Sequence, residues 1–489
     1  MRVRGLRSSG AAVVAVLLLA LVLTGCEPRT LSITTTPALF PRFSTSVPDY
    51  VSRCDDSAPV QVSISAPSGT TVTVEGAASG TGTFTTSVTR DVGQDFTIVV
   101  QSGSGTTTHH VRCLPGDFPS FTAQRTGRTQ SEYYVTAPSA GVGGSSYPIV
   151  FDTNGVPVWW GAKTAGFFAL LLPDGHVAWN NSSTNRVEEY TFDGQFVRSY
   201  RTVGQQYDFH DLVVLPNGNA LVVSVTQKPH VDLSSWGGPS DATIFDHTLQ
   251  EVTPQGAVAW SWVTSEHVPV TETTQHWRDQ ELAEPGGTFG DAFDPYHYNS
   301  IEPTPDGTAV VVSFRHLDAV LKIDKATGNI VWKLGGTTTP ASLDVVGDRE
   351  FQPGGGGGFG GQHDARLLDA DTVSIYDDGS GRARPPRGVT YDIDETAGTA
   401  TLVQTVRDPL ESNVFCCGSF RRLPGGNVVF GWGGNANGTP DITESTRAGA
   451  RLFALDFTNT FVYRGIPVLP GVLNRDVLRS GMDAQFGTG

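Results

Sequence analysis

The sequence predicts an all-β protein, for three reasons. The chain has 489 residues and contains 57 glycines and 30 prolines, which is typical of a fold with many turns. Short segments rich in Val, Thr, Phe, Tyr and Trp recur between these turns, as they do in strands, and helical periodicity is weak. A two-part pattern of strand and turn also repeats from about residue 118 onward, as in the blades of a β-propeller.

Residues 1–25 are predicted to be an export signal. A basic segment with three arginines precedes the continuous apolar run Ala11–Leu23. Small residues directly before Cys26 are typical of a bacterial lipoprotein signal, in which Cys26 becomes the lipidated first residue. An ordinary signal peptide or a membrane anchor is the alternative, although the apolar run is short for a span. We therefore expect an exported protein held by lipid at the outer face of the bacterial cytoplasmic membrane.

A short tether, residues 26–44, and a small β-sandwich domain, residues 45–117, are predicted next. Apolar and polar residues alternate in several segments of the second region, and the turns between them are rich in Ser, Gly and Thr. Cys54 and Cys113 bracket the region. Because export permits disulfides, we expect these two cysteines to pair.

Residues 118–489 are predicted to form the β-propeller. One half of the repeated pattern is an apolar run around a turn of Pro, Asp or Asn, and Gly, as in Leu215–Leu221. The other half is a polar turn with a glycine, followed by an aromatic strand. Its copies are Asp152–Trp160, Phe192–Tyr200, Pro254–Trp262, Asp324–Trp332, Asp392–Val406 and Asp456–Tyr463. Six copies indicate six blades, and seven is the alternative because the two ends of a propeller often share one blade.

Three histidines occupy similar places in this pattern. His210, His297 and His363 each come just before an apolar run and its turn. The inner strands of a propeller all line the central channel, so we expect the three side chains to converge at one end of it. Asp208 and Asp364 are close neighbours in sequence that could hold one imidazole nitrogen protonated and leave the other free to react. A lone histidine would more often be structural, but three in successive blades predict a functional site.

Other polar residues are expected to join this site. Arg315 and His316 end the apolar run of the blade that His297 opens, and Asn299 adds an amide donor. The arginine could bind two oxygens of an anion in a fork. Tyr296 could stack on an aromatic substrate, or it could equally be a packing residue.

Charge and cysteine spacing exclude other classes of function. The net charge of −16 makes nucleic acid a poor partner and makes clustered Arg and His side chains more notable as an anion site. The adjacent residues Cys416 and Cys417 could form a vicinal disulfide or remain two thiols in a turn. No CxxC or matched histidine spacing supports a metal pair, so no metal or cofactor is predicted.

Six segments carry a pattern that extends over roughly residues 118–470. They are His210–Leu212, His297–Ile301, Ser313–His316, Thr327–Gly336, Gln362–His363 and Asp377–Gly379. In this order they resemble the bacterial arylsulfate sulfotransferases, in the branch found in actinobacteria and fungi. The resemblance implies a six-bladed propeller that needs no nucleotide sulfate donor. It also implies transfer of a sulfuryl group from a phenolic sulfate to a phenol through a sulfohistidine. His363 matches the nucleophile, and His210, His297 and Arg315 match the groups around the sulfuryl oxygens.

Two other classes of function remain as alternatives. Three histidines with Asp or Gln can also hold a divalent metal, as in a metal-dependent propeller enzyme such as a polysaccharide lyase. A binding propeller without catalysis is the second alternative, because a fold does not fix a function. Arg315 discriminates against a metal, since a cation is unfavourable beside a metal ion and favourable beside a sulfate.

Overall fold

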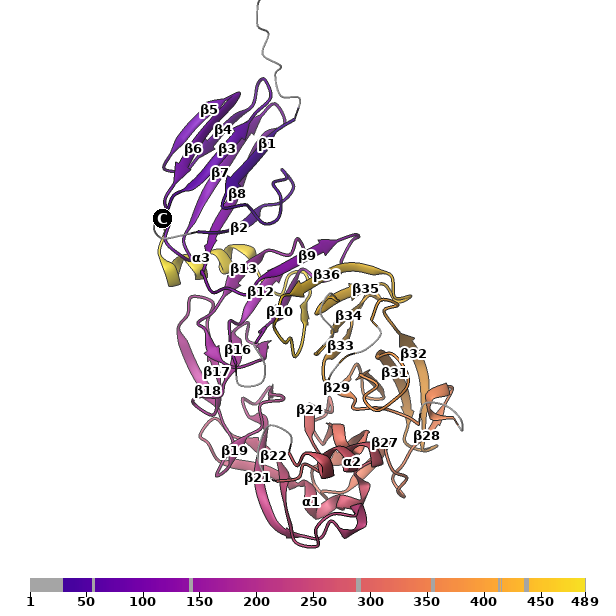
Figure 1. Cartoon of the computed structure of the whole chain (residues 1–489). Coiled ribbons are helices and arrows are strands. Elements are labelled where there is room, and N and C mark those ends of the chain that lie inside the picture. The colour runs from indigo at the N-terminus through magenta and orange to yellow at the C-terminus, as the bar shows by residue number, and fades with distance from the viewer. Residues whose placement is uncertain are drawn as a thin grey trace, which may run out of the picture.

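The computed structural model describes residues 30–54, 58–139, 144–286, 292–352, 357–411, 414, 416–434 and 439–488. These residues form a small β-sandwich and a six-bladed β-propeller (Figure 1), so the predicted fold class is confirmed. The signal segment and Cys26 lie outside the described residues. Within the described residues, no helix is long and apolar enough to cross a membrane.

The sandwich begins earlier than predicted. Its first sheet contains β1 (Ser32–Thr36), β3 (Val60–Ser65) and β6 (Thr83–Val88). Its second sheet contains β2 (Asp49–Arg53), β8 (Gly105–Leu114), β7 (Asp95–Ser102), β4 (Thr71–Val74) and β5 (Ala78–Thr81). Because β1 pairs with β3, the prediction of a tether over residues 26–44 is wrong from Ser32 onward. A disulfide joins Cys54 and Cys113 in the core of the sandwich.

Six sheets around one axis make up the propeller, and each runs outward from an inner strand. Blade 2 has β15 (Ala169–Leu171), β16 (Val177–Asn181), β17 (Arg186–Tyr190) and β18 (Phe196–Tyr200). Blade 3 has β19 (Gln206–Tyr207), β20 (Val213–Val214), β21 (Ala220–Val231), β22 (Ala242–Val252) and β23 (Val258–Val263). Blade 4 has β24 (Tyr298–Pro303), β25 (Ala309–Phe314), β26 (Ala319–Asp324) and β27 (Ile330–Gly335).

Blades 5 and 6 each carry a fifth, outermost strand. Blade 5 has β29 (His363–Leu367), β30 (Thr372–Asp377), β31 (Arg387–Asp394), β32 (Thr399–Val406) and β28 (Asp344–Val346). Blade 6 has β33 (Ser419–Arg422), β34 (Val428–Gly431), β35 (Ile442–Ser445), β36 (Arg451–Phe457) and β9 (Phe121–Arg125). In this last blade the outermost strand comes from the N-terminal end of the propeller and pairs with β36.

Blade 1 closes the ring from the other end of the chain. It has β37 (Ile466–Val468), β10 (Tyr133–Thr136), β12 (Ile149–Asp152) and β13 (Pro157–Trp160). Its innermost strand, β37, comes from the C-terminal end and pairs with β10. Strands from both ends of the propeller segment therefore hydrogen-bond across the closure, which leaves no open sheet at the seam.

The repeated turns correspond to fixed positions in the blades. The Pro–Asp/Asn–Gly type connects the first and second strands of blades 2 to 6, for example β20 and β21 through the turn closed by Leu215 and Asn219. The second type connects the third and fourth strands of blades 1 to 5. The sixth copy, Asp456–Tyr463, is a wrong assignment because it follows the fourth strand of blade 6, whose own turn runs through Gly449.

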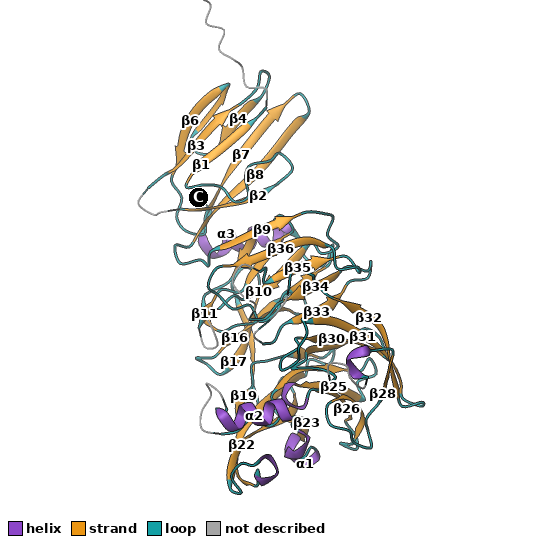
Figure 2. Ribbon diagram, turned by 45° about the vertical axis from the view of Figure 1, so that its right-hand side comes forward, coloured by secondary structure: helices purple, strands orange, loops and turns teal. Residues whose placement is uncertain are grey.

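Helix α3 (Arg475–Phe486) joins the two domains. It lies between the sandwich and the propeller in both views (Figures 1 and 2). On the sandwich side, Asp483 pairs with Arg112 at 2.8 Å and Arg479 with Asp49 at 2.7 Å. On the propeller side, the Gln485 amide donates to the carbonyl of Phe192 at 3.0 Å.

The remaining elements are short. Two helices, α1 (Thr264–His267) and α2 (Gln275–Ala283), lie in the connection from blade 3 to blade 4. A two-stranded pair, β11 (Ser145–Ser146) and β14 (Thr164–Ala165), flanks blade 1. Single 3-10 turns are η1 (Ser234–Trp236), η2 (Val270–Glu272), η4 (Arg315–Leu317) and η5 (Arg349–Phe351).

Candidate active site

The three candidate histidines lie at the start of the inner strands of neighbouring blades. His210 comes shortly before β20, His297 immediately precedes β24, and His363 is the first residue of β29. The ring centres of His210 and His297 are 5.1 Å apart. The ring of Tyr463, from the connection between β36 and β37, lies 5.8 Å from His210 and 6.3 Å from His363. The structure thus brings the three histidines together at one end of the channel.

The strand ends that carry them are irregular. The pairing of β24 with β25 shifts between Tyr298 and Ser300, and that of β29 with β30 shifts between His363 and Arg366. His297 has a φ of +50°, which side chains other than glycine rarely adopt. Bulges and strained backbone of this kind re-aim side chains and cluster at functional sites.

His363 is held as a neutral imidazole with one reactive nitrogen. Its side chain is buried, and Nδ1 lies 2.7 Å from the carbonyl oxygen of Gly361. Because a carbonyl can only accept, Nδ1 carries the proton and Nε2 carries the lone pair. Burial, together with the positive charge of Arg315, holds the pKa of His363 well below its usual value. The ring is therefore a neutral imidazole near pH 7, with its lone pair on Nε2.

This hydrogen bond corrects one prediction. Asp364, which follows His363, does not hold its imidazole. The Asp364 carboxylate instead accepts from Arg366 at 3.0 Å and from Arg421 at 2.7 Å. Successive residues of a strand point to opposite faces, so a sequence neighbour of this histidine is poorly placed to bond its ring.

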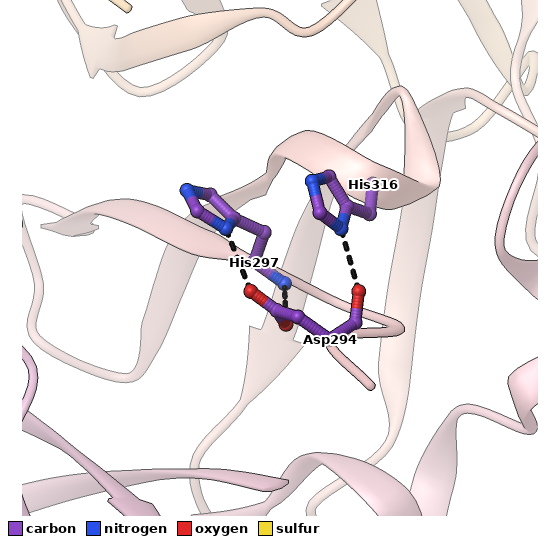
Figure 3. A group of neighbouring side chains, drawn as sticks. All are labelled: Asp294, His297 and His316. Carbon is purple, nitrogen blue, oxygen red and sulfur yellow. Dashed lines mark hydrogen bonds and ion pairs between the residues drawn. The ribbon is translucent and has the colours of Figure 1, made fainter. Parts of the chain in front are cut away.

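Two other aspartates, Asp208 and Asp294, each contact a pair of histidines. Asp208 accepts from Nδ1 of His210, as predicted, and its second oxygen lies 3.2 Å from Nε2 of His247. Asp294 accepts from Nδ1 of His297 at 2.7 Å, and its main-chain carbonyl accepts from Nδ1 of His316 at 2.5 Å. In Figure 3 the Nε2 atoms of the latter two rings lie on the side away from Asp294.

These contacts fix the same tautomer in three imidazole rings, with the proton on Nδ1. His210, His297 and His316 each donate from Nδ1, which leaves Nε2 for a substrate. Burial alone would raise the pKa of Asp294, but the charge of His297 and its hydrogen bond lower it far below the usual value. Burial lowers the pKa of His297 itself, against the opposing charge of Asp294. The pair is therefore a carboxylate with a largely neutral imidazole.

Arg315 is placed to bind an anion. Its guanidinium carbon lies 4.2 Å from the ring centre of Trp277, on α2. Its Nε atom is buried and has no hydrogen-bond partner among the described residues. A buried guanidinium donor without a partner is costly unless a ligand satisfies it. An anion with several oxygens could accept hydrogen bonds from this guanidinium.

A buried network of ion pairs connects the inner strands next to the histidines. Asp211, directly after His210, pairs with Arg366 at 2.7 Å and with Arg464 at 2.8 Å. Arg464 also donates to the main-chain carbonyl of Asn299 at 2.7 Å. These contacts connect blade 3, blade 4, blade 5 and the C-terminal closure, so they fix the inner strands relative to one another.

Aromatic side chains border the histidines. The ring of Phe167 lies 5.3 Å from Tyr463 and 6.3 Å from His210. Cys416 and Cys417 are joined by a disulfide, which decides the alternative left open by the sequence. Both cysteines pack in the same apolar cluster as Phe167 and Tyr463. This apolar wall suits a flat aromatic group.

The three residues predicted to bind substrate, Asn299, His316 and Tyr296, differ in their contacts with the site. Asn299 is buried and donates to the carbonyl of Gln362 at 2.8 Å, so its amide positions the strand of His363. His316 stacks between His297, at 4.6 Å, and Trp277, at 4.4 Å. Tyr296 is a packing residue, because it is buried in the core and its hydroxyl donates to the carbonyl of Val268.

Two groups of described residues have ligand atoms close enough for a metal ion. One is Asp294, His297 and His316, which is drawn in Figure 3. The other is Asp174, His176 and Glu189 in blade 2. In the first group both ring protons already point at Asp294, and in the second Glu189 accepts from His176, Arg198 and Tyr200.

A comparison with protein families gives one match. The model of the arylsulfotransferase (ASST) family matches residues 122–461, which is well over half of the chain. The chain belongs to the arylsulfotransferase family. The match includes residues of all six blades and confirms the resemblance to the family, though it does not test the branch. Family membership supports an arylsulfotransferase activity, with small aryl sulfates and phenols as substrates.

Other comparisons show only distant likeness. A protein of unknown function from Bacteroides caccae has 14% identity, 69% coverage of this chain, 99% of that chain, and a TM-score of 0.41. Virginiamycin B lyase from Staphylococcus aureus has 12% identity, coverage of 72% and 90%, and a TM-score of 0.32. The β-propeller domain of Cps50 (Swd1) from Myceliophteria thermophila has 11% identity, coverage of 68% and 87%, and a TM-score of 0.30. The comparison with curated proteins finds no match.

Several site residues of this arylsulfotransferase family member were missed in the sequence. Asp294 could have been found, because it stands three residues before His297 much as Asp208 stands two before His210. Trp277 and Tyr463 carry no local signal, since each reaches the histidines from an element distant in sequence. Only the tertiary fold places them.

Proposed function

We propose that the protein transfers a sulfuryl group from a phenolic sulfate to a phenol through a covalent sulfohistidine at His363. The observation that carries the proposal is the hydrogen bond from Nδ1 of His363 to the Gly361 carbonyl. It fixes the tautomer whose Nε2 lone pair can attack sulfur. In the first step the Nε2–S bond forms, the bond from sulfur to the aryl oxygen breaks, and the aryloxide leaves with the electron pair.

Arg315 and two histidines would stabilise the charge in this step. The negative charge of a sulfuryl group in transfer is spread over three oxygens, as in phosphoryl transfer. The guanidinium of Arg315 can donate to two of them. His210 and His297, whose Nδ1 atoms donate to Asp208 and Asp294, would add to this in their imidazolium forms, in which Nε2 also carries a proton and can donate to the remaining oxygen and to the aryl oxygen.

A second phenol would complete the cycle. Neutral His297 can accept the phenolic proton at Nε2, because its Nδ1 proton is held by Asp294. The phenolate oxygen then attacks sulfur, the Nε2–S bond breaks, and the electron pair returns to His363. The free imidazole is restored, so no cofactor is consumed.

The intact mass of the purified, detergent-solubilised protein tests the proposal. After brief mixing with 4-nitrophenyl sulfate and no acceptor, the wild type gains one sulfuryl group, about 80 Da, and releases nitrophenol. His363→Gln gains none. His109→Gln is the matched control, because His109 lies in the sandwich, is also buried and also donates Nδ1 to a carbonyl, that of Val47 at 2.8 Å. Absence of the adduct in a folded wild type, or its survival in His363→Gln, would overturn the proposal.

A metal-dependent reaction is the second candidate, and one observation favours it. Asp294, His297 and His316 place ligand atoms within 4.8 Å of one another. A divalent cation there would have to take the place of two ring protons and lie near the charge of Arg315, which is unfavourable. Stoichiometric bound metal, with activity lost on chelation and restored by that metal, would support this candidate.

We propose a lipid anchor for the same protein, from the sequence before residue 27. The basic segment, the apolar run and the small residues before Cys26 fit a lipoprotein signal. Fractionation of cells checks this. The wild type should remain with the membrane and carry a diacylglyceryl mass on Cys26, whereas Cys26→Ala should lose that modification.

A further inference from the structure

A buried carboxylate lies behind the nucleophile and is not used in the mechanism above. The Oδ2 atom of Asp378 is 3.6 Å from Nδ1 of His363. This oxygen is buried and has no hydrogen-bond partner among the described residues. The other oxygen, Oδ1, accepts from the backbone N–H of Ser380 at 2.7 Å. One side of the carboxylate is thus anchored, and the other faces the catalytic ring.

The backbone between the two groups is built for their close approach. A Cβ atom at Gly361 would lie 2.9 Å from Oδ1 and 3.1 Å from Oδ2 of Asp378. Gly361 also has a φ of +65°, so a side chain there would be strained as well as obstructed. The same glycine provides the carbonyl that accepts from His363. Its lack of a side chain lets the carboxylate reach the ring.

We propose that Asp378 is a positioning residue for sulfuryl transfer, whose negative charge stabilises the cationic ring that His363 becomes when Nε2 bonds to sulfur. This inference rests on the function proposed above. When the Nε2–S bond forms, the ring keeps its Nδ1 proton, bonded to Gly361, and acquires a positive charge. The carboxylate transfers no proton and forms no bond. It acts only through its charge, 3.6 Å from Nδ1.

The ionisation of Asp378 makes this effect depend on pH. Burial raises the pKa of its carboxyl to about 7, against the opposing charge of Arg315 and hydrogen bonds from Ser380. The charged and titratable groups that face it are Arg315 from η4, His363 from β29, and Tyr376 and Asp377 at the end of β30, directly before Asp378. Above about pH 7 the carboxylate is ionised and assists the reaction; below it the neutral acid does not.

Adduct formation measured against pH tests the inference. The rate of adduct formation is measured by rapid quench and intact mass with 4-nitrophenyl sulfate. In the wild type this rate should rise with pH in one step, centred near pH 7, as Asp378 ionises. Asp378→Asn should remove the step and reduce the rate at pH 8 by about tenfold or more, one pKa unit of lost interaction. Asp378→Glu should restore a step, because it restores the carboxylate.

A milder variant and a matched control accompany these two. Ser380→Ala removes a side-chain hydrogen bond that lowers the pKa of Asp378, so the step should move to higher pH. Glu281→Gln removes another buried carboxyl whose pKa is about 7 and which faces His316 at 3.9 Å. This control should retain the step.

Each outcome supports or overturns the inference. A pH step that survives in Asp378→Asn overturns the role of Asp378. So does a step that keeps its pH in Ser380→Ala and disappears in Glu281→Gln. In that case the adduct still forms, so the proposed function stands. A wild type that forms no adduct at any pH overturns both. If Asp378→Asn does not fold, the other two variants test the inference. It is then overturned if the step keeps its pH in Ser380→Ala or is absent in Asp378→Glu.

Discussion

The guanidinium of Arg315 stacks on the indole ring of Trp277, with 4.2 Å between the guanidinium carbon and the ring centre. Trp277 in turn stacks on His316 and donates from Nε1 to Asp318 at 2.9 Å. A residue of α2, outside all six blades, therefore holds the cation on which anion binding would depend. The connection from blade 3 to blade 4 is part of the site.

Replacement of Trp277 should weaken the binding of the sulfate. A desolvated cation–π contact is worth about 2 kcal/mol, so Trp277→Leu should lower kcat/KM for 4-nitrophenyl sulfate by roughly 30-fold. Trp277→Phe keeps a ring under Arg315 and should lose less. Initial rates of nitrophenol release with a phenol acceptor measure both variants. Equal losses in the two variants would mean that the stacking is only structural packing.

Asp294→Asn should impair the reaction through the ring of His297, since the main-chain carbonyl that binds His316 is kept. The carboxylate accepts from His297 at 2.7 Å, and an amide in its place would donate to the ring or turn away. General acid–base catalysis by a positioned histidine is typically worth about 10²–10⁴-fold, so loss of the carboxylate that holds the ring should lower kcat by about 10-fold or more. Asp279→Asn, which changes an exposed acid of α2, is the control for loss of charge. Comparable kcat values in Asp294→Asn and the control would contradict the assigned role.

Buried His363 should make the folded state more sensitive to acid. Its folded pKa is depressed, so its contribution to stability is complete above the unfolded pKa near 6.5 and declines as pH falls below it. Relative to the wild type, His363→Gln should gain up to about 1.4 kcal/mol of unfolding free energy for each pH unit between 6.5 and 5. Urea unfolding at several pH values measures this difference. Buried carboxyls with a raised pKa, such as Asp378, have the opposite effect on the pH dependence of stability, in the wild type and in His363→Gln alike. The difference in unfolding free energy between the two proteins therefore reports on His363, whereas the pH dependence of either protein alone does not.

The two disulfides should contribute differently to stability. Cys54 and Cys113 are 59 residues apart, and loss of such a bridge typically costs about 2–5 kcal/mol. The double variant Cys54→Ala and Cys113→Ala should therefore unfold the sandwich at lower denaturant concentration. Cys416 and Cys417 are adjacent and close no loop of other residues, so their double alanine variant is the matched control. A larger loss in the control would show that packing beside Tyr463 outweighs chain entropy.

The fold was predictable because its signals are local. Each turn with a glycine, such as those at Gly218 and Gly256, requires a backbone that glycine adopts readily, and its repetition marks the strands on either side. The six blades follow from these turns. The closure does not, because β9 and β37 find their partners across more than three hundred residues, and no local pattern records that pairing.

The sequence by itself determined the blade repeat and the similar placement of His210, His297 and His363. Periodicity, turn chemistry and motif spacing are properties of neighbouring residues, so they can be read along the chain. The tertiary structure decided which atoms hold each ring. Gly361 and not Asp364 holds His363, and Trp277 reaches Arg315 from another element. Such contacts depend on backbone direction and on distances between blades, which the fold alone sets.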